Sequence, residues 1–430
     1  MLAAAEAASP VDAVDRVARE LGVTFDAVAV SFLITDLSGR ALVRLAHVPL
    51  LERPDGTRCA GELTSRERRE EEELATVLPF DGGPEEQAIR TQRVQVVPPK
   101  ASADGSSDAA SWRVLAPVTE RGESIGLLAM QLPEEPDGEE MAEIAQVAHL
   151  LAFVVIANRR HTDLFEWGQR TRGFSLSAEI QQRLLPEART CEAAAFTLAG
   201  WLEPAASIGG DTFDYSLERN RLHVSLTDAM GHGVGAALTA SMCLAGLRGG
   251  RRTGMSLLEQ AVSANAALSE RGERDGGDDF VTGLISRLDL ATGVLDIVNA
   301  GHVPPYLLRD SKVELLELRV DLPLGMFGGS GYGSSQLQLE AGDRVVFVTD
   351  GMLERKAASI HLPTAIRETS ALHPREVVRA LADSALAAAG HSRQDDATVL
   401  CLDWHGTHDE DRASVSGAES FRASDPLPLG

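Results

Sequence analysis

Aspartates recur beside apolar, strand-like runs in the C-terminal half of this sequence. Four segments share the pattern: Asp211 in a GGD segment, Asp228 before Ala229, Asp350 before Gly351, and Asp395 in a QDDAT segment. Carboxylates that converge at strand ends repel one another unless a cation lies between them. Oxygen ligands favour hard ions such as Mg²⁺ or Mn²⁺ over Zn²⁺. The pattern therefore predicts a divalent metal site in a β-rich domain.

A single Asp-Gly turn is common in loops, so the prediction depends on four sites in one domain. We expect strands to end at the first three acids and a strand to follow Asp396. Asp214 is either an outer partner of the site or a turn acid. No His or Cys pair has zinc spacing.

Glycines surround two of these acids. Gly209 and Gly210 would let the backbone come close to a bound ion, and Gly231 and Gly233 would let it turn sharply into a helix over 231–248. That helix is apolar almost all round, so we expect it to be buried against a sheet. Its N-terminus would point towards the acids and help to hold an anionic oxygen.

Composition limits the class of protein. The 430 residues are enough for two domains, and the net charge of −24 argues against a nucleic-acid partner. Four scattered cysteines without a CxxC pair fit a reducing, cytoplasmic location. The N-terminus lacks the pattern of a secretory signal, and the longest apolar stretch, 149–157, is too short to span a membrane.

Patterning divides the chain into four parts. The first part contains helical spacing over 11–21, strands over 28–35 and 41–47, a hairpin of 112–118 with 124–132, and a helix after Pro136. The charged segment 52–73 is expected to be a solvated loop or helix surface, and 98–111 a loop. We expect an N-terminal domain over 1–157, a helical connector over 158–190, a β-rich domain over 191–404 and a disordered tail over 405–430.

The second half resembles a known family. The segments GGDTFDY, TDAMGHGVGAAL, NAGHVPPYLL, LPLG, TDGMLE and QDDATVL are similar, in order, to those of PPM-type (protein phosphatase 2C-like) serine/threonine phosphatases of the stage II sporulation protein E branch. SAEIQQRLLP is similar to the helix that opens these domains. The resemblance covers about 175–404. It implies an α-β-β-α sandwich that binds two divalent ions, Mn²⁺ or Mg²⁺.

The resemblance also implies roles for single residues. Asp211 would bridge both metals, Asp228 and the carbonyl of Ala229 would bind one, and Asp350 and Asp395 would complete the ligand set. Asp396 stands where many members have Asn, and Thr212 where an aromatic residue is frequent. His302 in the NAGH segment is expected to be structural. Two such ions would activate a water for in-line attack on phosphorus.

Residues 11–157 resemble a GAF domain, a sensory fold with an antiparallel sheet and flanking helices. The segments DAVAVSFLITDLSGRALVRLA and RVLAPVTERGESIGLLAM carry this resemblance. It implies a pocket for a small-molecule ligand, although no ligand signature is present. The fold class expected for the whole chain is α+β.

These expectations define a function. We predict a cytoplasmic, metal-dependent phosphatase that acts on phosphoserine or phosphothreonine of a regulatory protein, by resemblance an anti-sigma-factor antagonist. A helix from about Glu139 to Leu184 would couple the sensory domain to the site and contribute to a homodimer. One alternative is a GAF-based binding protein with an inactive phosphatase-like half. Another, a two-metal nuclease, is disfavoured by the acidic composition.

Overall fold

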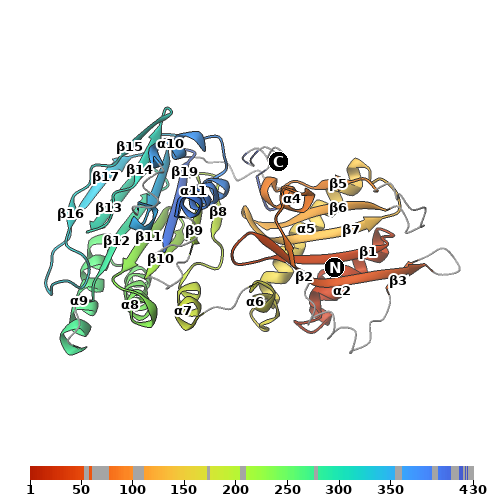
Figure 1. The fold of residues 1–430 in the computed structure, drawn as a ribbon, viewed down its shortest axis with the longest axis horizontal. Coiled ribbons are helices and arrows are strands. Elements are labelled where there is room, and N and C mark those ends of the chain that lie inside the picture. Colours follow the sequence, from red (N-terminus) through yellow and green to blue (C-terminus); the bar gives the residue numbers. More distant parts are fainter. Residues whose placement is uncertain are drawn as a thin grey trace. The chain divides into compact units, whose positions relative to one another are not determined.

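A computed structural model describes residues 1–52, 58–60, 77–99, 111–171, 175–203, 210–275, 279–353, 361–389, 396–407, 416–419, 422 and 424. The chain forms two compact units, Met1–Gly173 with Ala413–Gly430, and Phe174–Arg412 (Figure 1). The boundary lies inside the expected connector, so the helix of the SAEIQQRLLP segment belongs to the second unit.

The first unit is built on an antiparallel sheet of order β3-β2-β1-β7-β6-β5, with β4 paired to β2. Its strands are β1 (Ala29–Thr35), β2 (Ala41–Glu52), β3 (Arg58–Ala60), β4 (Val77–Pro79), β5 (Gln95–Val97), β6 (Trp112–Glu120) and β7 (Glu123–Leu132). The predicted hairpin is β6–β7, which turns at Arg121 and Gly122 with positive φ. The segments 52–73 and 98–111 lie largely outside the described residues, apart from the last residue of β2, strand β3, and residues 98, 99 and 111.

Helices cover both faces of this sheet. They are α1 (Leu2–Ala7), α2 (Ala13–Thr24), α4 (Pro84–Thr91), α5 (Gly138–Asn158) and α6 (Leu164–Gly168). Buried residues of α2 and α5 share one core with β1 and β6, whereas Ala88 and Ile89 of α4 pack on the opposite face. A capping box fixes the start of α5, because Asp137 accepts from the N–H groups of Glu139 and Glu140 and Glu140 bonds back to Asp137.

Of the described helices, α5 with its C-terminal extension to His161 is long and apolar enough to cross a membrane by composition, with a mean hydropathy of 1.6. Its inner residues, among them Ile144 and Leu151, are buried in the core of the first unit. Core packing therefore accounts for part of its apolar character.

The expected single helix over 139–184 is wrong. The structure divides it into α5, α6 and α7 (Leu176–Leu184). Asn158 donates to the carbonyl of Val154 at the end of α5, and Thr162, Asp163 and Gly168 have low helix propensity. Ser175 starts α7 afresh by accepting from the N–H of Ala178.

The second unit has two facing sheets. One has the order β10-β11-β12-β13-β16 with β17 on β13, and the other β15-β14-β18-β19-β9-β8. The strands are β8 (Thr190–Glu192), β9 (Phe196–Glu203), β10 (Asp211–Glu218), β11 (Arg221–Ala229), β12 (Val281–Asp289), β13 (Val294–Ala300), β14 (Tyr306–Arg309), β15 (Lys312–Leu315), β16 (Val320–Asp321), β17 (Ser334–Gln338), β18 (Arg344–Val348) and β19 (Ala397–Trp404). Phe213 and Leu226 of the first sheet share one core with Phe347 and Leu400 of the second.

A helical layer lies outside each sheet. Helices α8 (Gly233–Arg252) and α9 (Leu257–Asp275) pack on β12 and β13, and α10 (Leu362–Glu368) and α11 (Pro374–Ala389) on β18 and β19. The layers are helix, sheet, sheet, helix, as expected. Helix α8 is less buried than predicted, since Val234 and Leu238 are 42% and 46% exposed.

Two described residues of the tail, Ser416 and Gly417, are hydrogen-bonded to the first unit. Thr119 Oγ1 donates to the carbonyl of Ser416 at 2.6 Å, and the N–H of Gly122 donates to the carbonyl of Gly417 at 2.9 Å. These bonds use the backbone of the tail, so its polar, pattern-free sequence did not indicate them.

Candidate metal centre

The pairing of β10 with β11 places two predicted ligands face to face. Asp211 lies directly opposite Asp228 in the antiparallel register. Asp211 begins β10 and does not end a strand as expected, whereas Asp228 stands one residue before the end of β11. In an antiparallel pair the start of one strand lies beside the end of the other. The two acids therefore lie together although one begins its strand and the other stands near the end of its strand.

Asp211 is held from the opposite sheet. Thr349 Oγ1 and Thr398 Oγ1 each donate to Asp211 Oδ2 at 2.7 Å, and the N–H of Thr398 donates to Thr349 Oγ1 at 3.0 Å. Thr349 follows β18 and Thr398 lies in β19. The carboxyl group thus joins the two sheets of the sandwich.

The environment of Asp211 disfavours a lone negative charge. The residue is 2% exposed, and its pKa is raised well above the usual value, first by burial and then by the charges of Asp228 and Asp396. The two threonine hydrogen bonds oppose this shift only in part. A hard divalent cation would stabilise the ionised carboxylates here, so the donor set fits Mg²⁺ or Mn²⁺.

Two glycines permit close backbone packing at the centre. A Cβ atom on Gly210 would lie 2.3 Å from the carbonyl oxygen of Ala229, and one on Gly351 would lie 1.8 Å from that of Asp396. Only glycine fits either place. The first contact sets the position of the Ala229 carbonyl, the predicted backbone ligand.

Gln181 is a residue that sequence reasoning missed. Its side-chain amide, 2% exposed, donates to the carbonyl of Asp211 at 2.9 Å and to Asp396 Oδ2 at 2.5 Å. It lies on α7, in the SAEIQQRLLP segment. Its position in a segment shared with the family was the one available signal, and the structure adds that this helix contacts the acids.

Of the other two predicted ligands, the structure describes Asp350 but not Asp395. Asp350 is exposed in a short 3₁₀ turn (Asp350–Met352) directly after Thr349, and Asp395 lies outside the described residues. Among the described residues, no three His, Cys, Asp or Glu side chains are grouped closely enough to hold a metal ion by themselves. Asp211, Asp228 and Asp396 are nonetheless close enough to influence one pKa.

Asp214 is neither a turn acid nor part of this cluster. It is 3% exposed and accepts from Arg248 Nη2 at 2.8 Å and from both Nη atoms of Arg251 at 3.2 Å. Arg248 also donates to the carbonyl of Leu184, at the end of α7. The group joins β10, α7 and α8.

The NAGH segment is structural in its contacts. Asn299 Oδ1 accepts from the N–H of His302 at 2.7 Å, and Asn299 Nδ2 donates to the His302 carbonyl at 3.0 Å. The His302 ring bonds to Thr282 at 2.8 Å, and burial lowers its pKa to about 4. Thr282 pairs with Asp228 in the β11–β12 register, so His302 supports the centre as a neutral side chain.

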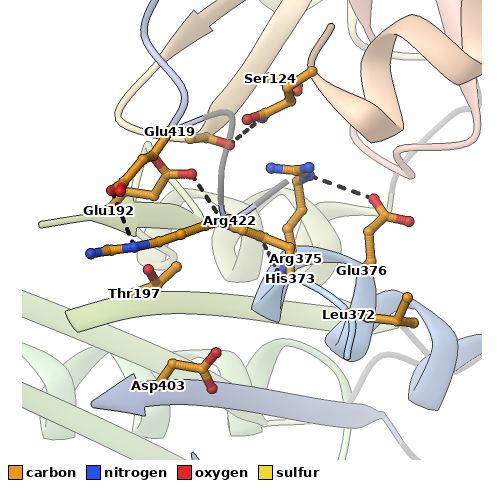
Figure 2. A network of polar contacts seen from close by, with 12 residues as sticks. Ser124, Glu192, Thr197, Leu372, His373, Arg375, Glu376, Asp403, Glu419 and Arg422 are labelled. Carbon is orange, nitrogen blue, oxygen red and sulfur yellow. Dashed lines mark hydrogen bonds and ion pairs between the residues drawn. The ribbon is translucent and has the colours of Figure 1, made fainter. Parts of the chain in front are cut away.

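A separate buried pair joins β8 to the start of α11. Figure 2 shows His373 beside Glu192, with Nε2 of the imidazole 3.0 Å from Oε1 of the carboxylate. The N–H of Arg375 donates to His373 Nδ1 at 3.1 Å, so Nε2 carries the proton of the neutral ring. Burial, and then the nearby Arg375, lower the pKa of His373, and Glu192 opposes them.

Known proteins are similar to this chain mainly over the C-terminal half, which contains the candidate metal centre. Residues 218–405 match the family model for Stage II sporulation protein E (SpoIIE). Phosphoserine phosphatase RsbP of Bacillus subtilis (strain 168) is 25% identical over 240 residues, 54% of this chain and 58% of that protein. Phosphoserine phosphatase RsbU of the same organism is 23% identical over 275 residues, 60% of this chain and 79% of RsbU.

Solved structures match over similar spans. The RsbU and RsbW domains of a Mycobacterium tuberculosis protein are 25% identical, covering 50% of this chain and 62% of that one, with a TM-score of 0.43. The phosphatase domain of SpoIIE from Bacillus subtilis is 20% identical over 49% of this chain and 64% of that one, with a TM-score of 0.42.

The family model and the relatives point to the same kind of domain for residues 218–405. This region is similar to SpoIIE-type phosphatase domains and to two relatives named as phosphoserine phosphatases. The chain spans 58% of the length of RsbP, so activity, substrates and partners of the whole protein are treated as proposals below.

Proposed function

We propose that this chain is a metal-dependent serine/threonine protein phosphatase. The observation that carries the proposal is the position of Asp211, buried between two sheets, opposite Asp228 and near Asp396. The hydrogen bonds described for its side chain come from threonine hydroxyls, which carry no positive charge. The match of this region to a phosphatase family supports the same conclusion.

The proposed centre holds two divalent ions, Mn²⁺ or Mg²⁺. Asp211 would contact both ions, Asp228 and the Ala229 carbonyl one of them, and Asp350 and Asp395 would complete the set. When bound, such ions supply Lewis acidity that activates water and neutralises phosphoryl oxygens.

The protein's own part is to orient these ligands. Thr349 and Thr398 both bind Oδ2 of Asp211, which fixes the plane of the carboxyl group. Gln181 holds the neighbouring Asp396 in place, and Asn299 shapes the turn that carries His302. Such rigid support keeps ligands in a productive geometry.

The proposed substrate is a phosphoserine or phosphothreonine of a small regulatory protein, such as an anti-sigma-factor antagonist. The relatives named phosphoserine phosphatases support this substrate class. The first unit, with its antiparallel sheet and helices on both faces, supports a GAF-like sensor that regulates the phosphatase unit and takes a small-molecule ligand. We place the protein in the cytoplasm as a homodimer.

The test is release of phosphate from a phosphoserine peptide by the full chain in the presence of Mn²⁺. Wild type should be active, and Asp211→Asn and Asp350→Asn should not be. Asp310→Asn is the matched control, because Asp310 is an exposed acid with a φ of 48° that Asn tolerates. An inactive wild type with both Mn²⁺ and Mg²⁺ would favour the alternative, a sensor with an inactive phosphatase-like half.

A further inference from the structure

The loop that follows Leu324 leaves its sheet at the end that carries Asp228. Leu324 and Val281 exchange two backbone hydrogen bonds of 2.8 Å, and Val281 pairs with Ala229 in the β11–β12 register. Both pairings are antiparallel, so β11 and the segment through Leu324 run in the same direction. Neighbouring strands lie about 4.8 Å apart, so the loop begins roughly 10 Å from the proposed ligand Ala229.

This loop, residues 325–332, is anchored by one buried side chain. Asn265 of α9 is 1% exposed. Its Oδ1 atom accepts from the N–H of Gly325 at 2.9 Å and from the hydroxyl of Tyr332 at 3.0 Å, and its Nδ2 atom donates to the carbonyl of Phe327 at 3.1 Å. These hydrogen bonds fix both ends and the middle of the loop, so the side chains at its tip are pre-organised.

The tip of the loop presents apolar side chains. Phe327 is 59% exposed and Met326 is 36% exposed. Met230, which directly follows Ala229, is 43% exposed. Its N–H donates to the carbonyl of Phe280, which precedes β12, so Met230 leaves the sheet at the same end as the loop. Single exposed apolar residues are common on protein surfaces, but three of them beside one candidate site suit contact with an apolar partner.

The chemistry of the centre selects the partner. The proposed ions would bind the phosphoryl group, so the substrate residues on either side of the phosphoserine must pass over the surface around the centre. An extended chain advances about 3.3–3.6 Å per residue, so residues three and four positions from the phosphoserine span the roughly 10 Å to the loop. Phe327 and Met326 carry no charge and would favour apolar side chains at those positions, because contact removes both partners from water.

We propose that Phe327 is a specificity-determining residue for the phosphoprotein substrate and that Asn265 is its positioning residue. The partner is a substrate segment with an apolar side chain, such as leucine, three or four residues from its phosphoserine. The inference rests on the proposed function, because it assigns a further contact to the same substrate. Phe327 contributes to the binding of the flanking residues and takes no part in the chemistry at phosphorus.

The test compares two phosphoserine peptides that the full chain hydrolyses in the presence of Mn²⁺. One peptide has leucine at the third and fourth positions on both sides of the phosphoserine, and the other has serine there. Wild type should have a kcat/KM at least about tenfold higher for the leucine peptide, mainly through a lower KM, because a tenfold preference needs only partial burial of one such side chain. Equal values for the two peptides overturn the proposal.

Variants assign the preference to Phe327. Phe327→Ser should reduce the preference to within about twofold, and Phe327→Leu should retain most of it. Leu217→Ser is the matched control, because Leu217 is 46% exposed but stands six residues along β10 from Asp211, about 20 Å away. It should keep the preference of wild type. A Phe327→Ser variant that keeps the preference, or a control that loses it, overturns the proposal.

Asn265→Asp tests the positioning role. The change keeps an acceptor for Gly325 and Tyr332 but replaces the donor to the Phe327 carbonyl with a second oxygen, so the tip should become less ordered. The KM for the leucine peptide should rise severalfold more than the KM for the serine peptide. An equal change for both peptides would show that Asn265 supports only the fold and would overturn its assigned role.

A lipid surface is the other partner that an exposed apolar loop tip can contact. Wild type and Phe327→Ser are floated with vesicles of neutral and anionic lipid. Wild type that stays unbound supports a protein substrate as the partner of the loop. Wild type that binds vesicles through Phe327 overturns the proposal.

Failure of this inference can be distinguished from failure of the proposed function. p-Nitrophenyl phosphate has no flanking residues, so its hydrolysis reports on the metal centre alone. Wild type that hydrolyses this ester but treats the two peptides alike keeps the proposed function and overturns the role of Phe327. Wild type that is inactive on all three substrates overturns both.

Discussion

Strand β10 carries two buried carboxylates three residues apart, and their surroundings are opposite. Asp214 accepts hydrogen bonds from the guanidinium groups of Arg248 and Arg251, so its charge is compensated by the protein. Asp211 is surrounded by threonine hydroxyls and by the charges of Asp228 and Asp396. Burial is nearly equal, at 2% for Asp211 and 3% for Asp214.

The difference separates two uses of a buried acid. A buried charge is tolerated when a partner compensates it, and Asp214 has its partners within the fold. The described side chains that bond to Asp211 are neutral, so among the described residues its charge has no such partner and a proton or a bound cation would compensate it. An acid left uncompensated inside a well-packed sandwich therefore points to a ligand more reliably than burial does.

The largest expected effect is that of Asp211→Asn on activity. Loss of a ligand that contacts both proposed ions should lower phosphate release by about a thousandfold, which corresponds to several kcal/mol in the barrier. The same change removes charge repulsion, so the metal-free protein should melt at a higher temperature. Thermal unfolding in a chelator measures the second effect. A lower melting temperature than wild type would show that the negative charge at Asp211 is already compensated.

Asp214→Asn should lower stability and leave activity nearly unchanged, the reverse of Asp211→Asn. It leaves two arginines without their carboxylate, and breaking a buried ion pair costs about 3–5 kcal/mol of stability. Urea unfolding measures this loss. The activity of the folded fraction, assayed well below the midpoint, should stay within a few-fold of wild type. A loss of Mn²⁺ affinity would contradict the separation of the two regions.

Gln181→Leu tests whether support from α7 matters to the acid cluster. Removing a group that orients ligands typically costs about 10- to 100-fold in metal affinity or activity. Gln182→Leu is the control, since Gln182 is bonded to Arg189 away from the acids. If excess Mn²⁺ restores activity to the Gln181 variant, the role is in metal affinity. An unchanged Mn²⁺ titration would show that the two hydrogen bonds are dispensable.

The smallest expected effect is that of His373, a buried histidine paired with Glu192. Burial lowers its pKa, so the folded state holds the ring neutral while the unfolded state protonates below its ordinary pKa of about 6.5. The stability from this group is present above that pH and is lost as pH falls towards the lower folded pKa. His373→Gln should flatten the fall in unfolding free energy between pH 7 and pH 5. An unchanged slope would mean that other groups set it.

The same comparison shows what a sequence can predict. Strand-to-turn patterning drew attention to Asp211 and Asp228, which the structure places opposite each other, although Asp211 begins its strand and does not end one. The role of Asp214 could not be decided, since its partners stand on a helix more than thirty residues further along the chain. Gln181 meets Asp396 across a separation of 215 residues, which no local pattern reports.

The errors have similar causes. A coupling helix over 139–184 was expected because an apolar stripe leads without a Gly/Ser linker into the segment that resembles the family's opening helix. Low helix propensity at Thr162, Asp163 and Gly168 interrupts it. The 231–248 segment is apolar on all sides, yet α8 meets the sheet with one side only. The composition of a helix shows how apolar its side chains are, but it does not show how many neighbouring elements will pack against the helix.

The hydrogen bonds from Thr349 and Thr398 to Asp211 have a consequence for biosynthesis. These residues are 138 and 187 positions away from Asp211, and contacts of such separation form late in folding. During translation Asp211 leaves the ribosome long before either threonine does. The nascent chain therefore presents isolated acids, and the proposed metal centre can be complete only after β19, the last described strand, has been synthesised and docked.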